Sequence, residues 1–117
     1  MGDIIQTFFE QLSTRGYQPL LHRASGTLRF DIEGRRSWEL VVRDGSISLA
    51  RDLPRVDCVI TCTQELFVRI VQGEQNPTTA FMQGKLEVTG DLGLAQLFQR
   101  LVRIRPETSL FTRRNDG

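Results

Sequence analysis

The stretch that decides the fold covers residues 57–99 and reads DCVITCTQELFVRIVQGEQNPTTAFMQGKLEVTGDLGLAQLFQ. Its first segment, 57–61, predicts a strand, because Cys58, Ile60 and Cys62 alternate with more polar positions and therefore share one face. After Thr63, a favourable N-cap, the apolar residues recur at helical spacing as far as Gly73. A strand followed by an amphipathic helix is the first unit of the fold.

The second half of the stretch repeats the change of period. Asn76 followed by Pro77 predicts a short helix, since asparagine caps a helix and proline suits its first position. Gly84 ends that helix, and residues 85–89 predict a strand. The dipeptide Gly90-Asp91 then opens a last amphipathic helix, expected to extend toward Ile104.

Upstream of this stretch the chain predicts a helix at 3–14, a short helical turn at 19–23 and three strands. The strands are expected at 26–33, 36–43 and 46–51, and Asp44-Gly45 between the last two is a strong hairpin signal. Each strand has one apolar face and each clear helix one apolar stripe. The economical arrangement is an α+β fold in which the helices are layered over one face of a single sheet.

Composition limits what the chain does. Its 117 residues, of which 39% are hydrophobic and 25% charged, suit one soluble domain, expected at 1–111, with a disordered polar tail at 112–117. A net charge of +1 gives no general attraction to nucleic acid. No apolar run is long enough to span a membrane, and no export leader precedes the first helix. The two cysteines, interpreted as buried and reduced, favour a cytoplasmic location.

A search for catalytic chemistry finds no convergent set of residues. His22 is the single histidine, and it falls in a short connection. The serines lack a nucleophile elbow, and Cys58 and Cys62 have no partner that would make them reactive. No further ligands stand at metal-binding spacing. We therefore predict no enzyme activity, no cofactor and no metal site.

Four segments of the deciding stretch, 57–61, 72–77, 80–86 and 90–95, occur in an order and at intervals that resemble the sterol carrier protein type 2 domain. Residues 26–32 and the strand of Trp38 are also similar to that family, so the resemblance covers about Ile4 to Leu101. It implies a five-stranded mixed sheet with about five helices on one face. It also implies an apolar tunnel for sterols, fatty acyl chains or similar lipids, with no metal or organic cofactor.

The apolar residues of the last helices and the Trp38 strand are the candidate ligand contacts. We predict that Phe81, Met82, Phe98 and Leu101 are the best of these, because a short helix such as that of Phe81 can shift at low cost. The alternative is that all of them are packed core residues. The full candidate set is Trp38, Leu40, Phe67, Ile70, Val71, Phe81, Met82, Leu94, Leu97, Phe98 and Leu101.

The predicted function is the non-catalytic binding, and by extension transfer, of a hydrophobic lipid (fatty acyl, isoprenoid or sterol-like). Two alternatives stay open: an accessory factor that presents a lipid in isoprenoid quinone biosynthesis, and a protein-interaction module with a filled core. Arg100, Arg103 and Arg105 form a basic patch for transient contact with anionic head groups, or simply complement the helix dipole. A homodimer is a further open alternative.

Overall fold

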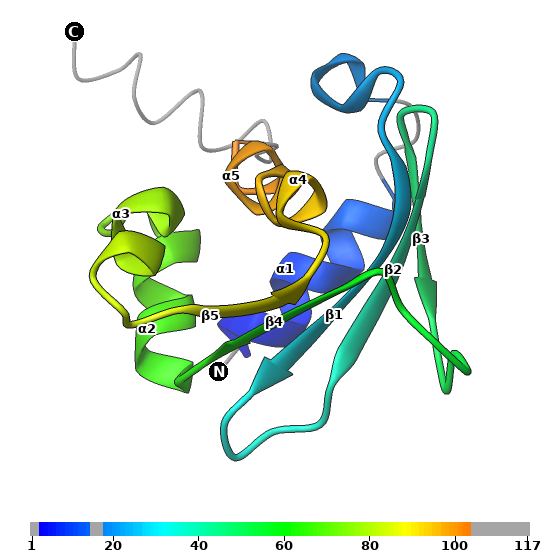
Figure 1. Cartoon of the computed structure of the whole chain (residues 1–117). Coiled ribbons are helices and arrows are strands. Elements are labelled where there is room, and N and C mark those ends of the chain that lie inside the picture. The colour runs from blue at the N-terminus through cyan, green and yellow to red at the C-terminus, as the bar shows by residue number, and fades with distance from the viewer. Residues whose placement is uncertain (1–2, 15–17, 104–117) are drawn as a thin grey trace, which may run out of the picture.

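The computed structural model of the chain describes residues 3–14 and 18–103 (Figure 1). The expected tail at 112–117, the end of the expected domain at 111 and Arg105 therefore lie outside the described residues. The elements, in chain order, are α1 (Ile4–Ser13), the 3-10 helix η1 (Pro19–Leu21), β1 (Ser25–Ile32), β2 (Trp38–Arg43), β3 (Ser46–Ala50), β4 (Cys58–Cys62), α2 (Gln64–Val71), α3 (Pro77–Met82), β5 (Glu87–Gly90), α4 (Leu92–Ala95) and α5 (Leu97–Leu101).

The five strands form one mixed sheet in the order β3-β2-β1-β4-β5. β1 is parallel to β4, and the other three neighbouring pairs are antiparallel. Phe30 at the centre lies opposite Trp38 on one side and Ile60 on the other, so one face of three strands carries large apolar side chains. Because a slip of one residue would turn this face to solvent, the alternation of apolar residues sets the register.

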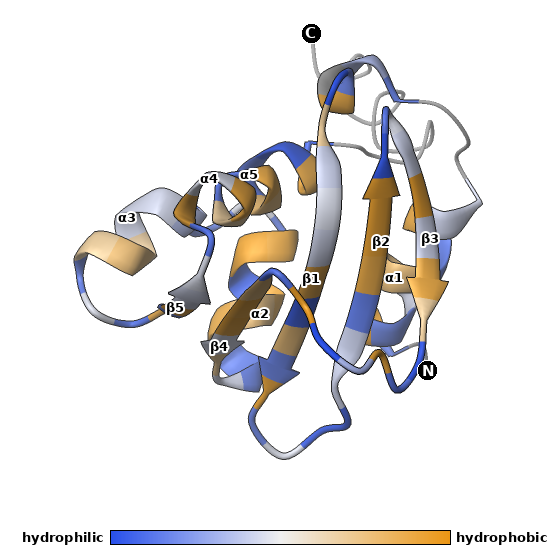
Figure 2. Ribbon diagram, turned by 45° about the vertical axis from the view of Figure 1, so that its right-hand side comes forward, coloured by the Kyte–Doolittle hydropathy of each residue, from blue (hydrophilic) through white to orange (hydrophobic). Residues whose placement is uncertain are grey.

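The helices cover this apolar face of the sheet (Figures 1 and 2). α1 packs against β3 and α2, while α4 packs against β4 and β1. Asp3 is the N-cap of α1, and its carboxylate accepts hydrogen bonds from the backbone N–H groups of Ile5 and Gln6. The mixed five-stranded sheet with a helical layer confirms the predicted fold class.

A cluster of aromatic rings fills the space between the sheet and the helices. Phe67 stacks on Phe9 and on Phe98, with ring centroids 5.4 and 5.6 Å apart, and Phe30 meets Phe98 edge-on at 5.1 Å. These four phenylalanines are at most 1% exposed. Each such ring pair adds about 0.5–1.5 kcal/mol beyond the burial of its area, so this cluster holds α1, α2 and α5 on the sheet.

The expected last helix is divided into α4 and α5 at Gln96. The ψ angle of Gln96 is −18°, which is typical of a 3-10 turn and interrupts the regular helical hydrogen bonding. On the α4 side, Leu94 packs closely against β1, where a Cβ added to Gly26 would lie 2.6 Å from a Leu94 methyl carbon. On the α5 side, Phe98 and Leu101 enter the core. The two halves thus pack on different parts of the molecule, and this accounts for the break.

Candidate functional site

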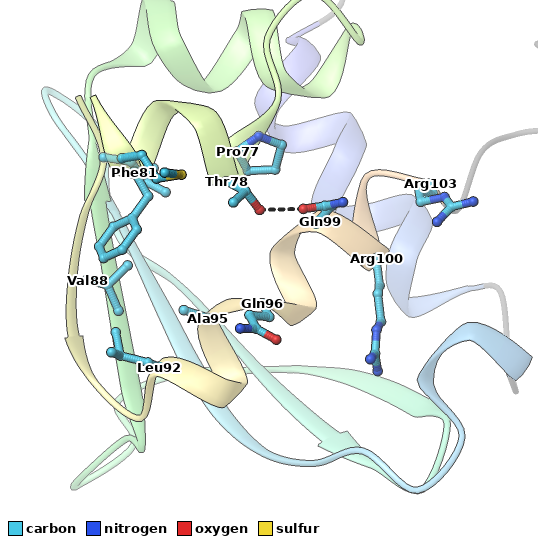
Figure 3. A pocket seen from close by; sticks show the side chains of 12 residues that line it. Pro77, Thr78, Phe81, Val88, Leu92, Ala95, Gln96, Gln99, Arg100 and Arg103 are labelled. Atoms are coloured by element: carbon cyan, nitrogen blue, oxygen red, sulfur yellow. Dashed lines mark hydrogen bonds between the residues drawn. The ribbon is translucent and has the colours of Figure 1, made fainter. Parts of the chain in front are cut away.

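A pocket of about 470 Å³ lies between α3, β5, α4 and α5 (Figure 3). Its volume falls within the range of about 300–1,000 Å³ that is usual for small-molecule sites. The residues that line it are Pro77, Thr78, Phe81, Met82, Leu86, Val88, Leu92, Ala95, Gln96, Gln99, Arg100 and Arg103.

One side of the pocket is apolar and unusually open to solvent. Phe81, Met82 and Leu92 are 42%, 79% and 56% exposed, respectively. In the described part of the chain, the other exposed large hydrophobic residue is Ile4 on α1. Single exposed apolar residues are ordinary on protein surfaces, but a group gathered in one hollow marks a binding surface.

The length and capping of α3 explain why its apolar residues face the pocket. Asn76 caps the helix by accepting a hydrogen bond from the backbone N–H of Thr79, and Pro77 occupies the first helical position. Pro77 and Ala80, three residues apart, are the buried residues of α3. The neighbouring positions Phe81 and Met82 are consequently left outside the core.

The opposite side of the pocket is one face of α5 and the turn before it. Gln96, Gln99, Arg100 and Arg103 are spaced at i, i+3, i+4 and i+7, so they share a helical face. In Figure 3 the two glutamines lie between the apolar group of Phe81, Val88 and Leu92 and the two arginines. Within residues 3–14 and 18–103, neither arginine forms a salt bridge with an acidic side chain.

A hydrogen bond joins the two sides of this pocket. The Thr78 hydroxyl on α3 donates to the Oε1 atom of Gln99 on α5, and Figure 3 shows the bond as a dashed line. Thr78 is exposed and Gln99 is half-buried, so the bond lies near the surface.

Two of the eleven predicted ligand contacts, Phe81 and Met82, line this pocket. Val71 and Leu94 are half-buried against the core. The remaining seven are buried core residues: Trp38, Leu40, Phe67, Ile70, Leu97, Phe98 and Leu101. Their contact with a ligand stays a prediction, and in this structure the rings of Phe67 and Phe98 stack on each other where the tunnel was expected.

Sequence reasoning missed Thr78, Leu92, Ala95, Gln96 and Gln99 as lining residues. Leu86 and Val88, from the strand predicted at 85–89, also line the pocket. A signal for Leu92 existed, because an N-cap aspartate at position 91 places residue 92 in the first, exposed turn. The sequence could not indicate that Gln96 and Gln99 line a pocket, because the direction of their helical face depends on the break between α4 and α5.

The chemistry available in the pocket is limited. Its described lining has Arg100 and Arg103 as charged groups and carries neither a carboxyl, a thiol nor an imidazole. Cys58 and Cys62 are free and buried, and burial raises the pKa of the first thiol to about 11 and that of the second to about 12. Groups of three or more His, Cys, Asp or Glu residues placed to hold a metal ion do not occur within the described residues.

A second hollow, of about 570 Å³, lies beside the ends of β1, β4 and β5. Charged side chains of both signs line it, among them Asp31, Glu33, Arg35 and Lys85. This lining suits solvent better than an apolar ligand, because buried charges without partners are costly.

The domain thus consists of a mixed sheet, one helical layer and a pocket that has an apolar side and a basic side. The sequence matches the model of the SCP-2 sterol transfer family over residues 5–103, so the chain belongs to that family. Membership places it among domains of sterol and lipid binding or transfer. Helices long and apolar enough to cross a membrane do not occur in the part of the chain that the structure describes.

Known proteins agree with this membership. Human sterol carrier protein 2 is 39% identical over 66 residues, which are 56% of this chain and 12% of that protein. The chain therefore spans about an eighth of the length of that relative. Among solved structures, palmitated SCP2L2 from Aedes aegypti superposes with a TM-score of 0.62 at 19% identity, over 85% of this chain and 90% of that one. A ubiquinone synthesis protein, UbiJ-SCP2, gives 0.61 at 21% identity, over 86% and 90%.

Proposed function

We propose that this domain binds a hydrophobic lipid, without chemical change, in the pocket between α3, β5, α4 and α5. The observation that supports the proposal is the gathering of exposed Phe81, Met82 and Leu92 around one hollow. The sterol transfer role of the family points in the same direction.

The driving force would be the transfer of an apolar chain from water to this wall. Each buried methylene contributes about 0.8 kcal/mol. Association costs several kcal/mol in lost freedom, so a chain of many carbons is needed for tight binding. Met82, which is unbranched and adaptable, suits ligands of irregular shape.

In this proposal, the core residues of α5 that are predicted as ligand contacts lie beneath the pocket lining. Leu97, Phe98 and Leu101 lie on the inner side of α5, and Gln99 and Arg100 lie on its pocket side. A ligand that reached Phe98 or Leu101 would have to separate α5 from the aromatic cluster. We expect an acyl chain to reach Phe81, Met82 and Leu92 first.

The test is a comparison of lipid binding by matched variants. Leu92→Gln and Met82→Gln should weaken the binding of a fluorescent fatty acid at least about fivefold each, since each removes apolar area from the ligand's environment. Ile4→Gln is the control, because Ile4 is also a large exposed hydrophobe and does not line the pocket. Native mass spectrometry of the unaltered chain should show a co-purified lipid.

Two results would count against the proposal: no uptake of fatty acid, sterol or decyl-ubiquinone by the unaltered chain, or equal losses in the Leu92 and Ile4 variants. The first result would favour the alternative of a protein-interaction module with a filled core, and the second would mean that the lipid binds outside this pocket. Preference for decyl-ubiquinone over fatty acid would favour the alternative role in isoprenoid quinone biosynthesis. The likeness to UbiJ-SCP2, at 21% identity, concerns the fold alone.

Transfer between membranes would require contact with a lipid surface. Arg100 and Arg103 are exposed at the pocket, and they are the described members of the predicted basic patch that also includes Arg105. Each basic residue near an anionic surface contributes about 1 kcal/mol. A homodimer and a cytoplasmic location remain part of the proposal, to be examined by light scattering and by localisation in cells.

A further inference from the structure

The charged groups of the pocket are of one sign. Arg100 and Arg103 line it, and no carboxylate does so among its described lining residues. Both guanidinium groups lack an acidic partner within residues 3–14 and 18–103, so no neighbour there already neutralises them. A cationic group beside an apolar hollow favours a ligand that is itself apolar at one end and negative at the other.

The two kinds of lining residue are separated in space. The apolar residues come from α3, β5 and α4, whereas the basic residues come from the last turn of α5 and the residue two positions beyond it. Figure 3 shows Phe81, Val88 and Leu92 on one side and Arg100 and Arg103 on the other, with Gln96 and Gln99 between them. The order from apolar through neutral polar to cationic is the order of groups along an amphiphile with an anionic head.

Resting on the proposed function, we infer that the domain selects anionic amphiphiles, with the carboxylate or phosphate head bound by Arg100 and Arg103 at the C-terminal end of α5 and the chain lying on Phe81, Met82 and Leu92. Guanidinium groups suit this task because they stay charged and present several N–H donors to an oxyanion. The amide side chain of Gln96 has an N–H₂ group that can donate to the same head or to an ester oxygen beside it.

Arg100 and Arg103 are solvent-exposed, and this exposure limits the binding free energy that each of them contributes. Exposed ion pairs contribute about 0.2–1 kcal/mol each, a factor of about 1.5–5 in affinity. We therefore expect hexadecanoate and hexadecyl phosphate to bind several-fold more tightly than hexadecanol. The preference should weaken as salt is raised, because surface charges are screened.

The test uses the full chain and three single-chain probes with the same apolar chain: hexadecanoate, hexadecyl phosphate and hexadecanol. Competition against a fluorescent fatty acid gives the affinity of each. The double variant Arg100→Gln, Arg103→Gln should lose the preference for the two anions while its affinity for hexadecanol changes less than twofold. The single control Arg69→Gln removes an exposed arginine from α2, which lies outside the pocket lining, and should leave the preference intact.

The outcomes of this experiment distinguish a failure of the head-group inference from a failure of the proposed lipid-binding function. Failure of all three probes to bind would overturn the lipid-binding proposal itself. Equal affinity for hexadecanol and hexadecanoate in the unaltered chain would overturn the head-group inference alone. If the double variant keeps its preference for soluble anions but loses binding to vesicles containing phosphatidylserine, the arginines serve membrane contact and the inference is wrong. A difference between the two anions identifies the carboxylate or the phosphate as the preferred head.

Discussion

Thr78 on α3 and Gln99 on α5 form a hydrogen bond across the pocket, and this bond joins the two helices whose separation would open it (Figure 3). α3 is only six residues long and buries only Pro77 and Ala80, so it has few other attachments to the core. Elements with few buried contacts open at low cost. The bond is therefore placed to affect how fast a ligand enters and leaves.

We expect Thr78→Val to speed lipid release. The substitution keeps the shape of the side chain and removes the donor, and one such bond contributes about 0.5–1.5 kcal/mol, a factor of roughly 2–12 in rate if it breaks before release. Stopped-flow transfer of a fluorescent fatty acid to acceptor vesicles measures the rate. Thr79→Val is the matched control, because the neighbouring Thr79 hydroxyl makes no hydrogen bond across the pocket to any residue within 3–14 and 18–103. Equal rates in the two variants would exclude a gating role for Thr78.

A second prediction concerns two glycines with positive φ that flank the pocket. At Gly90, in β5, φ is +103° and an added Cβ would lie 2.4 Å from the backbone oxygen of Asp57. At Gly84, φ is +79° but no atom of the described residues lies within 4 Å of the added Cβ. Gly84→Ala should cost only the strain of a left-handed conformation, about 1–2 kcal/mol. Gly90→Ala should cost about 1–3 kcal/mol more, since backbone cannot move aside as a side chain does.

Urea denaturation of the two glycine variants measures this difference. The midpoint should fall further for Gly90→Ala than for Gly84→Ala, with the same dependence on urea concentration in both. A Gly84 variant that is the less stable of the two would show that the contact between β5 and the segment before β4 is not as close as described. The comparison also tests whether the close approach of the Asp57 backbone requires glycine at the end of β5, where the chain turns into α4.

A third prediction is that both thiols are unreactive in the folded protein. The reactive form is the thiolate, and burial, with help from the carboxylates of Asp91 and Asp57 at Cys58, raises both pKa values far above neutrality. Iodoacetamide at pH 8 should label neither cysteine in the native chain and both in urea, as read by intact mass. Rapid labelling of Cys58 under native conditions would mean that β4 opens more readily than its place between β1 and β5 suggests.

The sheet could be predicted from the sequence because its signals are local. Leu28, Phe30 and Ile32 alternate with polar residues, and Asp44-Gly45 marks the hairpin, so strand and face follow from the period alone. All five strands occur within two residues of the predicted positions. The helical layer followed for the same reason, from the stripes of Phe8 and Phe9 on α1 and Phe67 on α2.

The pocket could not be predicted in this way, because it depends on long-range packing. An apolar stripe has the same sequence pattern whether it faces a filled core or a pocket. The sequence therefore predicts ligand contact for Phe67, Phe98 and Met82 alike. In the structure Phe67 and Phe98 are buried, whereas Met82 is exposed. The break at Gln96 depends on the fit of Leu94 over Gly26, a contact between residues 68 positions apart. Such a contact leaves no periodic trace in the sequence.

A final prediction follows from the buried carboxylate on the sheet. Glu39 is 6% exposed, accepts a hydrogen bond from the backbone N–H of Leu53 at 2.9 Å and pairs with the guanidinium of Arg29 at 2.9 Å. The Leu53 N–H first, and then Arg29, hold the pKa of Glu39 below its usual value of 4.5. Because the folded chain favours the charged form, Glu39 stabilises it fully above pH 4.5, and this contribution is lost as the pH falls through the lower folded value.

Glu39→Gln should therefore reduce the free energy of unfolding by about 1.5–3 kcal/mol at pH 7, the usual contribution of hydrogen bonds to a charged group. The deficit should shrink as the pH is lowered from 4.5 toward the lower pKa of the folded chain, below which folded unaltered protein also carries a neutral side chain at this position. Asp3, whose pKa Arg35 also lowers, is present in both proteins, so the difference between their urea curves isolates Glu39. Glu33→Gln, an exposed carboxylate after β1, is the control and should change little at either pH. A deficit that stays constant from pH 7 to pH 3 would mean that the loss is one of packing around residue 39 and that its charge contributes nothing.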